Sequence, residues 1–486
     1  MATEILQSSG TESKPDRTDL DTEIMQAVNH RRLNPRQIQL FAIAGSIGKC
    51  LLVTVFCPGL SAFLIAFIFW ASVIWSIAQC QTEIITLFPV DGAPLRLAGR
   101  MVDPALGVAA GWNYFFIMTS YVVFEATVIN TVVEYWGYDK SPAILISVSL
   151  FFFFAINVYR ADLFGEVEFW IALGKVMLVI GLMFYTLVTM LGGNPLHDRF
   201  GFRYWKDPGV WAGANGTTRL QSFVNAVNVA GYCMGGPEYI SMIAGESKDP
   251  RRTIPRAFNT IVTRLVVFFI GGALCVGILV PYNDETLTGG SAKTYTGASP
   301  TKFLRRLNKK GVPYMAVIVV ILLSCLAYLA LGSSSAQVLN WILNFGTAGA
   351  MFNWCIMAIT WIRFDAAIKA QGIDRKALLH SQSRFQPFAG YWAFFWAFLF
   401  LWLQGYAVFL KGNWKVSTFI FNYGIIAFAA AVGLGWKIIK RTPFHRSEDV
   451  DLVSGLQFFD ALTEHYRQER EGAPVTVKDK LLAKLF

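Results

Sequence analysis

Charge is scarce in this chain. Asp, Glu, Lys and Arg make up 15% of its 486 residues, whereas hydrophobic residues make up 54% and include 40 Phe and 15 Trp. A soluble domain of this length has too few charges to cover so much apolar surface. The proportions predict a polytopic membrane protein.

Patterns typical of catalysis and cofactor binding are also missing. The sequence has no G-x-x-x-x-G-K-[ST] motif, which excludes a P-loop site for ATP-driven pumping. All five His residues lie outside the apolar runs, and the seven Cys residues lack paired metal spacing. We therefore expect no enzyme activity, no cofactor and no metal site. An ion gradient remains as the source of energy for any uphill step.

Apolar runs long enough to cross a bilayer occur at about eleven places. They are 38–56, 60–80, 105–132, 141–158, 168–191, 221–243, 257–280, 312–331, 338–362, 389–410 and 416–438. This pattern predicts an all-α polytopic fold with a transmembrane domain over 38–438. Residues 1–37 are expected to form a disordered cytoplasmic tail without a cleavable signal peptide, and 439–486 a cytoplasmic C-terminal tail.

The net charge of +10 is explained by membrane orientation rather than by nucleic-acid binding. Most basic residues before residue 281 sit in short loops that fall on one side if the N-terminus is cytoplasmic. The exception is the long loop 192–220, which should be external and holds Arg199, Arg203 and Lys206. A cation cluster at 302–310, however, follows a loop that helix counting places outside. The simplest explanation is a span missing between about Pro300 and Thr301. We expect a frustrated topology, in which 312–331 or 338–362 fails to insert or the C-terminal half is inverted.

Two of the predicted spans are interrupted by glycine. The span 221–243 contains Gly235, Gly236 and Pro237, followed by Glu238, and the span 38–56 contains residues 45–48 with the sequence GSIG. In lipid, such breaks persist only where the freed backbone groups line a cavity or meet a ligand, and a pair of broken spans indicates the substrate site of a secondary transporter. A half-helix start attracts a carboxylate and a half-helix end attracts an ammonium group, so the expected ligand is an amino acid or a betaine-like or polyamine relative.

The candidate substrate-binding residues lie at or beside the two breaks. They are Gly45, Ser46, Ile47, Gly48, Gly231, Tyr232, Gly235, Gly236 and Glu238. Three ionisable residues inside spans are candidates for proton coupling, because a charge at depth costs at least about 2.5–3.5 kcal/mol. They are Lys175, Glu238 and Glu125. Each has a structural alternative, which is snorkelling for Lys175, a satisfied structural carboxylate for Glu238 and a helix-to-helix hydrogen bond for Glu125.

A series of motifs in matching order covers about residues 30–455. It includes FAIAGSIG, GEVEFWIALGKVMLVIGL, GGPEYISMIAGESKDPRRTIPRAF, GILVPYND and WKIIKRTPFHRSEDVDLVS. These motifs resemble the fungal amino-acid permeases of the amino acid–polyamine–organocation superfamily. The resemblance implies twelve helices, the first ten in two inverted repeats of the leucine-transporter type, and proton-coupled amino-acid uptake at the plasma membrane. The chain has about eleven of these spans.

The resemblance also assigns roles to residues. It matches residues 45–48 to the substrate-carboxylate motif of the first helix, residues 231–238 to the break of the sixth helix, and Lys175 to a proposed proton-site amine of bacterial relatives. The run GPEYISM is similar to a subgroup that includes carnitine and polyamine-related permeases, so the substrate remains open among these classes.

Two departures from the family pattern support a different function. Lys49 and Cys50 replace a pair of small residues in the first-helix motif, and the family's eighth span is absent between two motifs that adjoin here near residue 300. The alternative is a transport-deficient relative, either a sensor-like protein or the product of a faulty gene model.

We expect Lys175→Met to abolish uphill accumulation and to leave substrate binding partly intact, because the substitution removes only the proton step. Accumulation at two external pH values, with binding measured in parallel, checks this expectation. Unchanged pH-dependent accumulation in the variant would contradict it.

Overall fold

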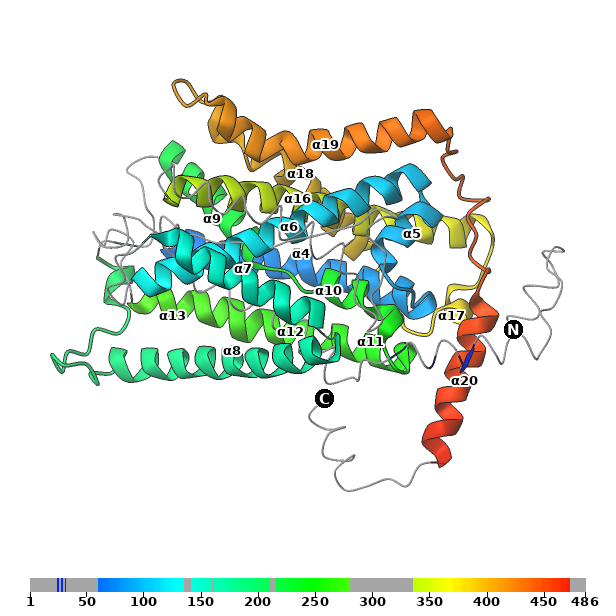
Figure 1. Cartoon of the computed structure of the whole chain (residues 1–486), viewed down its shortest axis with the longest axis horizontal. Helices are drawn as coiled ribbons and strands as arrows, with labels where there is room; N and C mark the ends of the chain where they lie inside the picture. Colours follow the sequence, from blue (N-terminus) through cyan, green and yellow to red (C-terminus); the bar gives the residue numbers. More distant parts are fainter. Residues whose placement is uncertain are drawn as a thin grey trace.

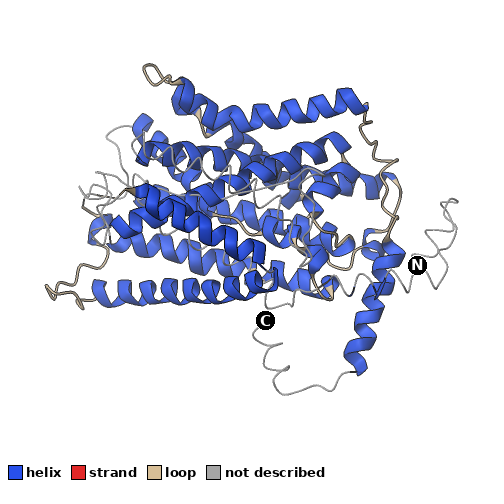
Figure 2. Cartoon of the chain, viewed as in Figure 1, coloured by secondary structure: helices blue, strands red, loops and turns tan. Residues whose placement is uncertain are grey.

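The structure is a computed structural model that describes Ile24, Met25, Val28 and Arg31 together with residues 60–134, 141–159, 161–207, 209, 216–279 and 335–472. Throughout these ranges the regular elements are helices, and no strand occurs (Figure 2). The predicted spans 38–56 and 312–331, the candidate residues Gly45–Gly48 and Lys49 all lie outside the described residues. The other predicted spans coincide with helices.

The long helices follow the apolar runs of the sequence. They are α4 (Leu60–Leu87), α6 (Pro104–Glu134), α7 (Pro142–Tyr159), α8 (Ala161–Met190), α9 (Gly216–Cys233), α16 (Ser335–Ala370), α18 (Phe388–Leu403) and α19 (Val416–Lys440). Span 257–280 is built from consecutive pieces, namely α11 (Pro250–Asn259), α12 (Ile261–Arg264), the π-helix η4 (Leu265–Ile270) and α13 (Gly271–Leu279). Seven helical segments of the described part are long and apolar enough to cross a membrane, which confirms the prediction of an all-α polytopic membrane protein.

Shorter helices lie between and after the spans. They are α5 (Ala93–Met101), α10 (Pro237–Met242), α17 (Arg375–Leu378), α20 (Leu456–Gly472) and the 3-10 turns η2 (Arg203–Trp205), η3 (Ala244–Glu246) and η7 (Tyr406–Phe409). Proline starts several of the helices, including α6, α7, α10 and α11. Its fixed φ suits the first turn, where its missing N–H would have no intrahelical partner.

The core of the bundle is formed around α4 and α16. Helix α4 packs against α9, α11, α16 and α18, and α16 also packs against α6 and α19 (Figure 1). Trp70 of α4 lies between Trp354 of α16 and Phe400 of α18, with ring centroids 5.0 and 5.8 Å apart. Helix α8 lies at the edge of the bundle against α7 and α13, and its outer face carries exposed apolar side chains.

The segment after α19 folds back onto one end of the bundle, which we call the α20 end (right side of Figure 1). Arg100 of α5 forms an ion pair of 3.0 Å with Asp451, and Arg251 of α11 forms one of 2.5 Å with Asp460 of α20. Gln371, just after α16, donates a hydrogen bond of 2.7 Å to the carbonyl of Val450. The predicted C-terminal tail is therefore a docked structure over its described part, up to Gly472.

The opposite end of the bundle carries the loop after α8 and the end of α13. Trp205 of η2 donates a hydrogen bond of 3.0 Å to the carbonyl of Gly277, so α13 ends there. Helices α4 and α16 both finish at the α20 end, where Trp361 of α16 donates a hydrogen bond to Glu83 of α4. Because α16 has 36 residues, its first residue, Ser335, lies at the opposite end of the bundle. Leu279 and Ser335 thus lie at the same end, and α16, α18 and α19 are not inverted relative to the first half.

The expectation that 338–362 is a weak span is wrong. Its region forms the core of α16, and 78% of the apolar window of this helix is buried inside the protein. Its glycines allow close packing, because a Cβ at Gly346 would lie 2.6 Å from the ring of Tyr232 and a Cβ at Gly349 2.5 Å from Ile117. Helices that associate in membranes use small residues in this way.

We expect single cysteines to report this arrangement in a cysteine-free background. Leu196→Cys and Asn413→Cys, at the opposite end, should react with a membrane-impermeant thiol reagent from one side of the membrane. Lys248→Cys and Lys376→Cys, at the α20 end, should react only from the other side. Labelling of the Leu196 and Asn413 positions from different sides would show that the C-terminal half is inverted after all.

Candidate functional site

The span 221–243 is broken where the sequence predicts. Helix α9 ends at Cys233, residues 234–236 form no regular structure, and α10 starts at Pro237. Gly236 has a φ of 150°, a conformation that favours glycine, and proline at the first position of α10 fixes the start of the new helix. The break therefore follows from local sequence and brings the negative end of the α9 dipole close to the positive end of α10.

The carboxylate of Glu238 occupies the start of α10. It accepts a hydrogen bond of 3.2 Å from the backbone N–H of Gly236, and only 4% of the residue is exposed. Gly235 is required beside it, since a Cβ there would lie 2.6 Å from Glu238 Oε1. The anion that the helix start attracts is thus supplied by the protein itself, which makes the break a better partner for an ammonium group than for a carboxylate.

Tyrosines of α6 and α10 surround this carboxylate. Tyr114, Tyr121 and Tyr239 all lie within electrostatic reach of Glu238, and the side chains of Tyr121 and Tyr239 share a hydrogen bond. The ring of Tyr232 packs at 4.8 Å from Phe124 and 5.5 Å from Tyr121. Aromatic faces beside an anion form a setting that suits a cationic group.

The other candidates at the break have packing roles. Gly231 allows α9 to approach α4, because a Cβ there would lie 3.1 Å from Met351 and 3.3 Å from Trp70. Trp70 fixes this contact by donating a hydrogen bond of 2.7 Å to the carbonyl of Val227. Gly231, Tyr232, Gly235, Gly236 and Glu238 are therefore brought together between α4, α6 and α16.

The proton-coupling candidates are not gathered at one point. Glu125 lies half-buried on α6, one residue after the Phe124 that contacts Tyr232. Lys175 lies half-buried on α8, which packs against α7 and α13. Among the residues that the structure covers, Glu238 alone of the three candidates belongs to the broken helix.

Sequence reasoning missed Arg264, which lies midway along the apolar span Pro250–Leu279. It is 8% exposed, it is the last residue of α12, and the π-helix η4 follows directly. The rule that selected Lys175, a charge inside an apolar run, applies equally to this position.

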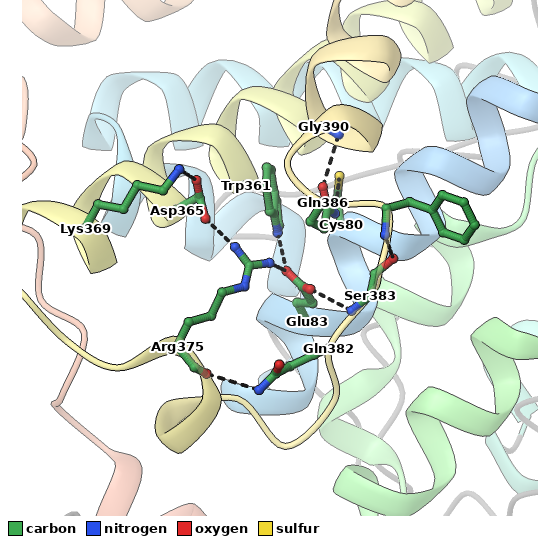
Figure 3. A network of polar contacts seen from close by, with 11 residues as sticks. Cys80, Glu83, Trp361, Asp365, Lys369, Arg375, Gln382, Ser383, Gln386 and Gly390 are labelled. Atoms are coloured by element: carbon green, nitrogen blue, oxygen red, sulfur yellow. Dashed lines mark hydrogen bonds and ion pairs between the residues drawn. The ribbon is translucent and has the colours of Figure 1, made fainter.

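A second buried polar cluster, the Glu83 cluster, lies at the α20 end (Figure 3). Glu83 of α4 is 1% exposed and accepts hydrogen bonds from Trp361 Nε1 at 2.8 Å, Arg375 Nη2 at 2.5 Å and the backbone N–H of Ser383 at 2.9 Å. Arg375 also pairs with Asp365, which forms an ion pair of 2.6 Å with Lys369. The cluster joins α4, α16 and the loop before α18. The predicted span ended at residue 80, so Glu83 was not considered as a buried residue.

Within the described ranges, no group of three or more His, Cys, Asp and Glu side chains is placed to hold a metal ion.

A bundle of apolar helices with one helix broken between two long neighbours is the architecture of a membrane transporter. A family model described as "Amino acid permease" matches residues 37–301 and 293–448. The chain belongs to the amino acid permease family.

Individual relatives cover most of the chain. The proline-specific permease of Emericella nidulans is 32% identical over 93% of this chain and 93% of its own length. The dicarboxylic amino acid permease and the lysine-specific permease of Saccharomyces cerevisiae are each 30% identical, over 94% and 89% of this chain and 83% and 79% of their own lengths.

The matches also bear on the missing span. The family match comes in two parts that meet at residues 293–301, where charge counting places the gap. The alignment with the Emericella nidulans relative has 512 positions, more than the 486 residues of the chain, so that relative contains residues without a counterpart here.

Two solved structures show a loose likeness. A manganese transporter of Eremococcus coleocola covers 94% of this chain and 98% of its own at 10% identity and a TM-score of 0.37, and inward-facing Mhp1 covers 88% and 95% at 12% identity and a TM-score of 0.29. At TM-scores this low, neither supports a statement about this chain.

We expect Gly346→Ala to damage the site. The new methyl group would press on the buried ring of Tyr232, and overpacking of this kind costs about 1–3 kcal/mol. Gly111→Ala is the matched control, because a Cβ on this glycine of α6 has no atom within 4 Å. Thermal melting in detergent and substrate uptake should both fall for the first variant and stay near wild type for the second. Equal behaviour of the two variants would show that the contact with Tyr232 is unimportant.

Proposed function

We propose that this protein is a proton-coupled transporter of amino acids or related zwitterions in the plasma membrane, with the α20 end facing the cytoplasm. The observation that carries the proposal is the break between α9 and α10, with a buried carboxylate at its centre. The family shows an amino-acid permease, and the break supplies the place where its substrate binds.

The substrate ammonium is the group that fits the break. The carbonyl end of α9, the carboxylate of Glu238 and the surrounding tyrosine rings all favour a cation. The substrate carboxylate then needs donors elsewhere, and Gly45, Ser46, Ile47 and Gly48 of the first span are the proposed partners. The side chain of the substrate is set by pocket shape, and the named relatives include permeases for proline, lysine and dicarboxylic amino acids.

Glu238 is also the leading candidate for proton coupling. Burial favours the protonated carboxyl group and a nearby ammonium favours the carboxylate, so proton binding at Glu238 and ammonium binding beside it are thermodynamically linked. Lys175 and Glu125 remain proposed partners of the proton step. The membrane orientation is supported by Arg31, near the N-terminus, which donates hydrogen bonds of 3.1 and 3.3 Å to the carbonyls of Pro89 and Ser247 at the α20 end.

A second candidate function is that of a transport-deficient permease relative. The family match in two parts, 37–301 and 293–448, favours it, because the absence of a family span near residue 300 would divide the match at that point. Uptake by this chain, compared with uptake by a version in which an eighth helix is restored between Pro300 and Thr301, separates the two functions. Uptake by the restored version alone would favour the second.

We expect Glu238→Gln to reduce uphill uptake by at least about tenfold, which is the rate effect of losing roughly 1.4 kcal/mol. If Glu238 carries the proton, exchange of internal for external substrate persists and its pH dependence disappears. If Glu238 pairs only with the ammonium, exchange is lost as well. Uptake and exchange by purified protein in liposomes, with an imposed pH gradient, distinguish these outcomes.

Glu464→Gln is the control for this experiment, because it changes an exposed carboxylate of α20. It should leave uptake and exchange unchanged. Wild-type behaviour of Glu238→Gln in both assays would remove the break from the proposed mechanism.

A further inference from the structure

Arg264 is a buried guanidinium that the proposed site does not use. It lies about 10 Å along the helix from residue 257, where the apolar run begins. It is 8% exposed and sits on the inner side of the helix with Ile261 and Leu265, which are both buried. Little of its side chain therefore faces lipid.

The described part of the chain supplies no counter-ion for this charge. Arg264 Nη1 has no hydrogen-bond partner there, and no described acidic side chain interacts with it electrostatically. The buried acids of the described residues have other partners, which are Arg375 for Glu83 and Asp365, Lys437 for Asp103 and the N–H of Gly236 for Glu238. A buried ion normally persists only where it is paired, so an anion from another source is expected beside it.

The surroundings of Arg264 connect it with the broken helix. Helix α10 leads through η3 directly into α11 and α12, and α10, α11, α12 and η4 all pack against α4. The π-helix η4 begins at the residue after Arg264, and π-helical turns occur frequently at functional sites because they interrupt the regular hydrogen-bond ladder.

We propose that Arg264 binds the carboxylate of the transported amino acid, as a second station on the path beyond the break. This inference rests on the proposed function. The break already holds the carboxylate of Glu238 and favours the ammonium end of a zwitterion, and residues 45–48 are the proposed donors to the substrate carboxylate at that station. Arg264 receives the same carboxylate at the second station, where a guanidinium offers two parallel N–H donors that match its two oxygens. The burial of Arg264 disfavours a lipid phosphate as the anion.

The test compares Arg264→Met and Arg264→Lys with wild type and with Arg256→Met, which removes an exposed cation from α11 of the same span. Purified protein is melted with and without proline, lysine and glutamate, with pyrrolidine and cadaverine, which lack the carboxylate, and with chloride. KM for uptake is measured in liposomes for whichever amino acid stabilises the wild type.

The proposal expects wild type and Arg256→Met to be stabilised by an amino acid and not by its decarboxylated analogue. Arg264→Met should lose this stabilisation and raise KM by roughly ten- to a hundredfold, the effect of losing a hydrogen-bonded charge pair. Without substrate it should melt at a higher temperature than wild type, because removal of an uncompensated buried charge relieves strain on the fold. Arg264→Lys, which keeps the charge without the two-donor geometry, should give an intermediate KM.

Several results would overturn the inference. A wild-type KM in Arg264→Met, a lower melting temperature with unchanged KM, or failure of both variants to reach the membrane would each identify a structural arginine. Stabilisation by chloride or by the decarboxylated amines to the same extent as by the amino acid would show that the carboxylate is not what Arg264 recognises. If neither wild type nor Arg256→Met binds or transports any amino acid, the proposed function fails, and that result is distinct from a failure at Arg264.

Discussion

A charge inside this bundle needs a partner from the protein or from a bound molecule, because lipid supplies none. Glu83 has three donors from α16, α17 and the loop before α18, and Arg375 is shared with Asp365. Glu238 is held by the backbone that the helix break has freed. The few buried charges thus lie where two helices meet or where a helix is interrupted, so that a donor is within reach.

Much of the fold was predictable from apolar runs, since burial and span length leave a strong signal in a membrane protein. The position of the break was also predictable, because Gly235, Gly236 and Pro237 act locally. The burial of α16 in the core was not predictable. Its small and polar residues lower the mean hydropathy of the segment, but they allow close packing against neighbouring helices. Glu83 was missed because its span was ended too early. The assignment of partners to Lys175 and Arg264 depends on contacts between distant segments, which a single sequence does not specify.

Helix α8 has little contact with the rest of the described bundle. Only 11% of the apolar window of α8 is buried, compared with 78% for α16. A helix with so little contact is held mainly by its neighbours α7 and α13, and its open face is apolar along its length. Lipid contact satisfies such a face, whereas the mostly buried α16 depends on its helix neighbours.

The docked C-terminal segment has a consequence for the order in which the protein is assembled. Arg100 is hydrogen-bonded to Asp451, which lies 351 residues later in the chain. Arg251 is likewise bonded to Asp460, which is also synthesised much later. At ribosomal speeds of 5–20 residues per second, Arg100 is made about 20–70 s before its partner. During that interval the first half of the bundle is already threaded into the membrane while its cations on the α20 side are still open to water, lipid head groups or chaperones. The contacts at this end therefore form late, after the rest of the bundle has been synthesised. A ribosome that stalls after α19 releases a chain that lacks the segment whose residues pair with Arg100 and Arg251.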